Sequence, residues 1–137
     1  MSSISKLLEP SEEIDAANLF HLLGNRRRKY TVVYMDRVEE APVEMGEAAE
    51  HVCALRKEKP LGSVTRRERK RAYSALRQTH LPKLDDHEIV EFSEVENTID
   101  YGPKFNVAAQ YASIEKAKSG IFQIYSLDKL SDFIRRN

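Results

Sequence analysis

The feature that most constrains the fold is a long amphipathic helix that begins at Arg66. Thr65 and Glu68 have the spacing of a capping box, in which the hydroxyl accepts from a backbone N–H and the carboxylate reaches back to the cap residue. At about 100° per residue, a core side and a basic side separate along this helix. We expect Arg69, nearer the core side, in a structural ion pair. The core side holds Glu68, Ala72, Ala75, Leu76 and Thr79, and the basic side holds Arg67, Lys70, Ser74 and Arg77, flanked by Arg66, Arg71 and Gln78.

Shorter elements precede this helix. Leucines at helical spacing predict a helix over 15–23, and Val43 lies in a short extended piece. A further helix is predicted over about 46–56, followed by a loop over 57–64 that contains proline and glycine. Asn25 is a suitable N-cap for another helix, whose first turn consists of Arg26, Arg27, Arg28 and Lys29.

A β-hairpin is predicted after the long helix. Apolar residues alternate in two short runs, one through Ile89 and Phe92 and one through Ile99 and Tyr101, with a polar turn between them. The segment that follows Pro103 is predicted to be helical, the segment 121–125 fits either a strand or a helix, and the last residues resemble a short helix.

This order of elements is that of a winged helix-turn-helix domain, so the expected fold class is α+β and mainly helical. Such a domain places one helix in the major groove of DNA and its hairpin beside the backbone. We therefore expect three parts: a flexible arm over 1–14, a winged helix-turn-helix domain over 15–102, and a helical extension over 103–137. The predicted DNA contacts are Arg66, Arg67, Lys70, Arg71, Ser74, Arg77 and Gln78 on the long helix, Arg26, Arg27, Arg28 and Lys29 at a helix start, and Asn97 and Thr98 in the hairpin.

The sequence also resembles a known family. The stretches "LFHLLGNRRRKYTVVYM", "GEAAEHVCALR" and especially "RKRAYSALRQTHLPKLDDHEIVEF" are similar to a winged-helix family common in halophilic archaea, whose members are presumed to regulate transcription. The resemblance covers about Leu19 to Tyr101 and implies a DNA-binding regulator. Proteins of salt-adapted cells are typically acidic, and this chain departs from that pattern.

Charge is segregated along a chain that is neutral as a whole. Residues 26–37 carry a net charge of +4 and residues 56–83 carry +8, whereas residues 84–100 carry −7. The two positive blocks coincide with the elements predicted to contact DNA. Glu94 and Glu96 make the hairpin turn acidic, which leaves Asn97 and Thr98 as its predicted contacts.

Other function classes receive little support from the sequence. Neither a CxxC nor an HxxxH pair is present, and Cys53 is the single cysteine, so we expect neither a metal nor a cofactor. The chain has no phosphate loop, nucleophile elbow or paired carboxylates, so we do not expect an enzyme. The sequence contains neither an apolar run long enough to span a membrane nor an N-terminal stretch typical of a secretion signal, so we expect a cytoplasmic location.

The C-terminal extension is too apolar to remain solvated alone. It either packs on the preceding domain or pairs with a second copy, and we favour a homodimer with two recognition helices. The favoured function is a double-stranded DNA-binding repressor, and the alternative is a winged-helix module that binds another protein instead of DNA. The residues predicted to form the dimer are Tyr111, Ile114, Phe122, Tyr125, Leu130, Phe133 and Ile134.

Overall fold

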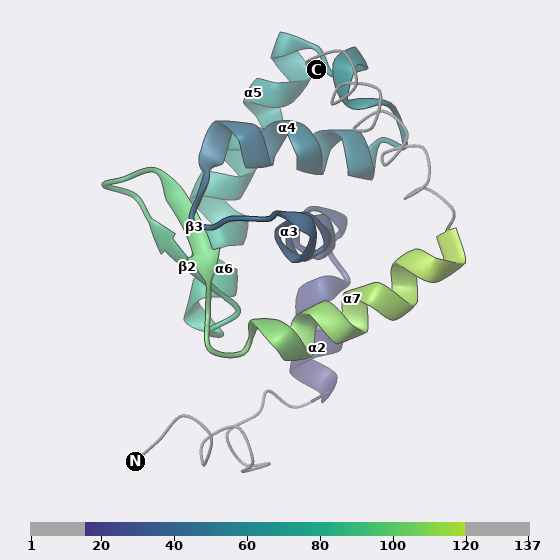
Figure 1. Ribbon diagram of the computed structural model, residues 1–137, viewed down its shortest axis with the longest axis vertical. Coiled ribbons are helices and arrows are strands. Elements are labelled where there is room, and N and C mark those ends of the chain that lie inside the picture. Colours follow the sequence, from purple (N-terminus) through teal and green to yellow (C-terminus); the bar gives the residue numbers. More distant parts are fainter. Residues whose placement is uncertain (1–15, 120–137) are drawn as a thin grey trace.

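The computed structural model of the chain describes residues 16–119, with side chains described through residue 113, and it is an α+β structure that is mainly helical (Figure 1). The predicted arm over 1–14 lies outside the described residues. The elements in chain order are α2 (Ala16–Leu23), α3 (Arg26–Arg37), β1 (Val43–Glu44), α4 (Met45–Arg56), the 3-10 turn η2 (Leu61–Ser63), α5 (Arg66–Ala75), the π-helical turn η3 (Leu76–His80), α6 (Leu81–Asp86), β2 (Val90–Ser93), β3 (Thr98–Tyr101) and α7 (Phe105–Ser119).

Side-chain caps mark the starts of α3, α4 and α5, as the sequence predicted for α3 and α5. Asn25 Oδ1 accepts from the backbone N–H groups of Arg27 and Arg28, at 3.0 and 3.3 Å. The capping box at α5 is complete, because Glu68 N–H donates to Thr65 Oγ1 at 3.1 Å and Thr65 N–H donates to Glu68 Oε1 at 3.0 Å. These caps satisfy N–H groups that have no partner within the helix.

A small antiparallel sheet has the strand order β1-β3-β2. The predicted hairpin is present: Val90 pairs with Tyr101, and Ser93 pairs with Thr98. Strand β1 adds to the other edge of β3 through the pair Val43 and Ile99. This pairing brings the start of α4, which directly follows β1, next to the hairpin.

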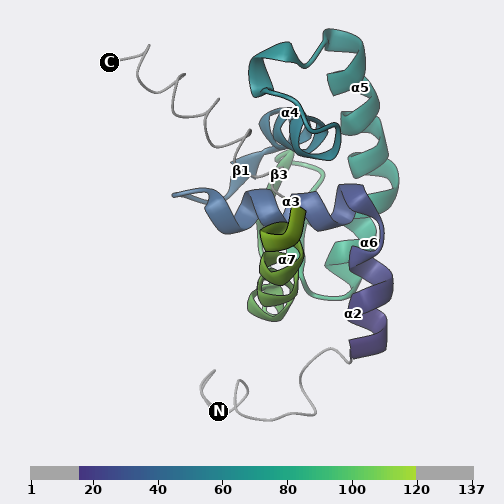
Figure 2. The ribbon, with the colours of Figure 1, turned by 90° about the vertical axis from the view of Figure 1, so that its right-hand side faces the viewer.

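Helix α3 lies at the centre of the molecule, and the other helices surround it (Figures 1 and 2). Val32 and Met35 are completely buried, and the rest of its apolar side chains are nearly so. Helix α7 packs against α3, and its buried face consists of Phe105, Ala108, Ala109 and Ala112. The first part of the predicted extension therefore belongs to the same core as residues 16–102, which is the cis-packing alternative that the sequence left open.

The long helix predicted from Arg66 continues through η3 and α6 to Asp86, and its register changes in the π-helical turn. The N–H of Leu81 donates to the carbonyl of Leu76, five residues earlier. Because a π turn advances each residue through a smaller angle than an α turn does, side chains beyond Leu76 move around the axis. Thr79, which we predicted on the core side, is exposed, whereas His80 is buried. The prediction for Thr79 was wrong because it assumed a uniform α-helix.

The buried side chains of Arg28 and His80 join α3 to η3. Arg28 Nε donates to the carbonyl of Leu22 at 2.7 Å, and Arg28 Nη1 lies 3.1 Å from His80 Nδ1. Since a guanidinium has no acceptor, His80 Nδ1 must be the unprotonated nitrogen of a neutral ring. Burial, followed by the charges of Arg28, Arg27 and Lys83, lowers the pKa of His80 to about 4.

The stability of the fold should therefore decrease as the pH falls. In the folded state His80 stays neutral down to its pKa of about 4, whereas in the unfolded chain it gains a proton below its ordinary pKa of 6.5. Protonation therefore favours the unfolded chain between these two pKa values, and the fold loses stability as the pH falls through that range. We predict that His80 lowers the free energy of unfolding by about 2 kcal/mol between pH 7 and pH 5. Urea denaturation of wild type and His80→Asn at both pH values measures this difference. Equal pH dependence in the two proteins would contradict it.

Candidate nucleic-acid interface

The outer face of α5 is a surface rich in cations. This helix lies along one side of the molecule (Figure 2). Ala72 is its one buried side chain. Six of the residues that were predicted on the basic side or flanking it are exposed: Arg66, Arg67, Lys70, Arg71 and Ser74 on α5 and Gln78 in η3.

Glu68, the one acid within the run from Arg66 to Arg71, does not neutralise this face. Its carboxylate accepts from Lys57 Nζ at 2.8 Å and from Lys59 Nζ at 2.5 Å, in addition to the N–H of Thr65. Hydrogen bonds from Lys57, Lys59 and Thr65 hold the pKa of Glu68 well below its usual range. Glu68 therefore fastens the start of α5 to the preceding loop, and its charge is balanced by two lysines outside the helix.

Arg69 differs from our expectation. We predicted a structural ion pair, but Arg69 Nε donates to the carbonyl oxygen of Gly46 at 3.3 Å, and no carboxylate within the described residues lies in ion-pair contact with it. The residue as a whole is exposed. Arg69 is thus directed towards α4, as the helical spacing indicated, but its charge adds to the basic surface.

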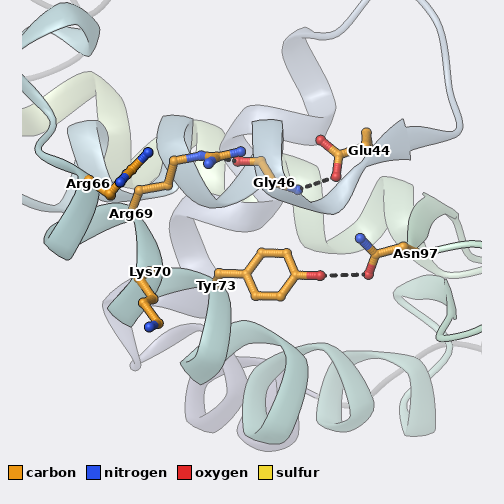
Figure 3. A pocket seen from close by; sticks show the side chains of 7 residues that line it. All are labelled: Glu44, Gly46, Arg66, Arg69, Lys70, Tyr73 and Asn97. Atoms are coloured by element: carbon orange, nitrogen blue, oxygen red, sulfur yellow. Dashed lines mark hydrogen bonds between the residues drawn. The ribbon is translucent and has the colours of Figure 1, made fainter.

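Asn97, in the hairpin turn, connects the hairpin to two helices. Tyr73 Oη donates to Asn97 Oδ1 at 2.9 Å (Figure 3). Arg77 Nη1 donates to the same oxygen at 3.1 Å, and the N–H of Met45 donates to the Asn97 carbonyl at 3.0 Å. Asn97 has a φ of 60°, a left-handed conformation that asparagine tolerates better than most residues. Asn97 and Arg77, both predicted to contact DNA, therefore make their hydrogen bonds within the protein.

The tip of the hairpin is acidic and carries an exposed apolar side chain. Glu94 and Glu96 are exposed, and Val95 between them is 97% exposed. Thr98, our other predicted contact in the hairpin, lies within β3, where it is half-buried and pairs with Ser93 and Glu44. Neither strand of the hairpin contains a lysine or an arginine, so the acidic tip has little to attract a phosphate.

The four basic residues at the start of α3 have different surroundings. The cationic groups of Arg26 and Lys29 lie over the ring of Tyr30, at 5.8 and 5.1 Å from its centroid, and both residues reach the surface. Arg28 is only 7% exposed and is held by Leu22 and His80, so we leave it out of the interface.

Arg27 is half-buried beside Arg56, from the end of α4. Burial, with a further contribution from Arg56, lowers the pKa of Arg27. The Nε atoms of both arginines are buried, and neither has a hydrogen-bond partner within the described part of the chain. Arg56 lies far from Arg27 in the sequence, and only the packing of α3 on α4 brings these cations together, so no local pattern singles out Arg56.

Candidates for metal binding or redox chemistry are weaker. The residues that the structure describes contain no group of three or more His, Cys, Asp or Glu side chains placed to hold a metal. Cys53 is buried in α4, and burial raises the pKa of its thiol, so the thiolate that would react is disfavoured. Within residues 16–119, no helix is long and apolar enough to cross a membrane.

Comparison with known proteins identifies a family. Residues 20–100 match the family described as "Domain of unknown function (DUF7344)", which is more than half of the chain. The chain belongs to this family. The DUF7344 segment runs from α2 to β3, so it includes the basic face of α5 and the Asn97 contacts. No curated protein and no solved structure matches the chain.

The contacts of Asn97 generate a stability prediction. Asn97→Gly keeps the left-handed backbone but removes the acceptor of Tyr73 and Arg77, and we expect it to lower the free energy of unfolding by about 1–2 kcal/mol. Tyr73→Phe should cost about 1 kcal/mol, and the double variant should cost less than the sum because the two changes remove the same hydrogen bond. Urea denaturation of the four proteins measures the coupling. Additive losses would show that the bond contributes nothing.

Proposed function

We propose that this protein is a winged helix-turn-helix regulator of transcription that binds double-stranded DNA, with α5 as its recognition helix. The order α3, β1, α4, α5, β2, β3 agrees with that architecture, and the short β1 paired with β3 brings the start of α4 beside the hairpin. In this proposal the hairpin is the wing. Asn97 holds it against α5, and its acidic tip points to a structural role for the wing rather than a grip on phosphates.

The observation that carries the proposal is the unneutralised basic face of α5. Arg66, Arg67, Lys70 and Arg71 are exposed, and among the described residues none of them is in an ion pair. Duplex DNA binds such a surface because each phosphate contact releases condensed counterions. The nearby acid, Glu68, forms ion pairs with Lys57 and Lys59, so its carboxylate does not compete with a polyanion for the cations on the outer face of α5.

The side chains of α5 divide into two proposed roles. Arg67, Lys70 and Ser74 lie at the middle of the outer face, where guanidinium, ammonium and hydroxyl groups can reach base edges in the major groove. Arg66 and Arg71 flank them and are suited to phosphates. Gln78 extends the same face by one turn into η3, where an amide can contact a base or a phosphate.

A second set of contacts is proposed at the start of α3. Arg26 and Lys29 reach the surface there, and α3 meets η3 through the bond between Arg28 and His80. Cations at this position would hold the DNA backbone next to the recognition helix. Arg27 can join them only through the part of its side chain that is exposed.

We also propose that the protein acts as a homodimeric repressor. Tyr111, one of the predicted dimer residues, is half-buried against the core of its own chain, so its contribution to a dimer is limited to its exposed part. The side chains of the other six predicted residues, from Ile114 to Ile134, lie outside the described residues. A dimer would present two α5 helices to half-sites about one helical turn apart.

The competing function is a protein-interaction module. The observation that favours it is the tip of the hairpin, where Val95 is almost fully exposed between Glu94 and Glu96. An apolar side chain flanked by carboxylates suits a basic protein partner better than it suits DNA.

A charge-reversal experiment tests DNA binding. Arg66→Glu/Arg71→Glu should abolish or strongly weaken binding to a short duplex at low salt. It should also reduce the slope of log K against log salt concentration by about one to two, because these two residues are the proposed phosphate contacts on α5 and each phosphate contact contributes about 0.9. A gel-shift titration at several salt concentrations measures both quantities.

The matched control makes the same charge change elsewhere. The end of α3 that leads to β1 lies away from α5 (Figure 2), and Arg37 is its last residue. Lys104 precedes α7 and pairs with Glu88 at 3.2 Å, so Arg37→Glu/Lys104→Glu should lose that ion pair but bind DNA nearly as well as wild type. Absence of wild-type binding at low salt, or equal loss in both double variants, would contradict the proposal and favour the protein-interaction module.

A further inference from the structure

A cleft of about 350 Å³ lies where α5, the start of α4 and the hairpin turn meet. Figure 3 shows Glu44, Gly46 and Arg69 along one side of it, and Tyr73 with Asn97 along the other. Arg66 and Lys70 complete the lining, from positions three residues before and one residue after Arg69. The cleft thus joins the basic face of α5 to the α4 start.

Arg69 is held in this cleft by Gly46. Its Nε donates to the Gly46 carbonyl, and a Cβ atom placed on Gly46 would lie only 2.5 Å from Arg69 Nη2. The missing side chain at Gly46 is therefore what lets the guanidinium lie against the first turn of α4. An oriented guanidinium loses less conformational freedom when it binds a ligand.

The cleft carries an excess of positive charge. Three cations line it, and Glu44 is its one acid. Both carboxylate oxygens of Glu44 already accept from α4, from the N–H of Gly46 at 2.8 Å and the N–H of Glu47 at 3.0 Å. Within the described residues, Arg66, Arg69 and Lys70 have no ion-pair partner. These three exposed cations are therefore available to an external anion.

We propose that this cleft binds a phosphate group, with Arg69 as its oriented ligand and Arg66 and Lys70 as flanking cations. Guanidinium groups bind phosphate through two parallel N–H donors, and a lysine adds a point charge. Arg69 Nε is occupied by Gly46, which leaves the two Nη groups for the ligand. The phosphate comes either from the DNA backbone or from a small phosphorylated molecule. The first source rests on the proposed function, and the second does not.

Gly46→Ala is the most informative variant, because it displaces Arg69 without changing any charge. Alanine is favoured over glycine in a helix by about 1 kcal/mol, and the displaced atoms belong to the ends of the flexible Arg69 and Glu44 side chains, so the fold should persist. Arg69→Gln removes the ligand directly. Arg37→Gln is the matched control, since Arg37 is an exposed arginine at the end of α3 that neither lines the cleft nor belongs to the proposed interface.

The test is an NMR titration of the full chain with inorganic phosphate that replaces chloride at constant ionic strength. We expect saturable shifts of the Gly46 and Tyr73 amides in wild type and in Arg37→Gln. Both Arg69→Gln and Gly46→Ala should bind about tenfold more weakly or worse, as expected for loss of a charged hydrogen bond. Shifts that do not saturate, or an equal loss in Arg37→Gln, would overturn the proposal.

A short duplex then distinguishes the two sources of phosphate. If Gly46→Ala and Arg69→Gln both bind the duplex several-fold more weakly, the DNA backbone supplies the phosphate. If both variants bind the duplex as tightly as wild type does but bind inorganic phosphate more weakly, the cleft serves a small phosphorylated molecule. If wild type binds inorganic phosphate but no duplex, the proposed function fails and the cleft assignment stands.

Discussion

The arrangement of the basic surface depends on where one carboxylate points. Glu68 lies between Arg67 and Arg69 in the sequence and would offset one of the five positive charges of residues 66–71 if it faced outward. Instead it closes the capping box with Thr65 and accepts from Lys57 and Lys59. This single side chain determines the first residue of α5 and attaches the helix to the preceding loop, and its neighbouring cations have no ion-pair partner among the described residues.

The far end of the same helix is held by different means. The π-helical turn rotates His80 into the core, where it accepts from Arg28 of α3, and Tyr73 and Arg77 hold the hairpin through Asn97. Together with the Gly46 carbonyl that accepts from Arg69, these bonds tie α5 and η3 to three neighbouring elements. The exposed cations therefore belong to a helix whose backbone is held at several points, which reduces the conformational entropy lost when a polyanion binds.

Local patterns in the sequence were sufficient for part of this structure. The caps at Asn25 and Thr65 were predicted correctly because a cap involves residues within one turn. The π turn was missed, and with it the exposure of Thr79, because spacing alone assumes a constant angle per residue. The roles of Arg28 and Asn97 depend on partners 52 and 20 to 24 residues away, which no local pattern contains. Packing of α7 was left open because its alanine-rich face fits either a core or a second chain.

The central claim is that duplex DNA docks on the outer face of α5. Chemical-shift mapping of the full chain with a short duplex at low salt tests it most directly, because one titration shows which backbone amides are affected by the DNA. The account predicts that the largest shifts fall on Arg66, Arg67, Lys70, Arg71 and Ser74, with smaller ones at Arg26 and Lys29, and that added salt reverses them. Unchanged spectra, or shifts confined to the hairpin tip around Val95, would contradict it.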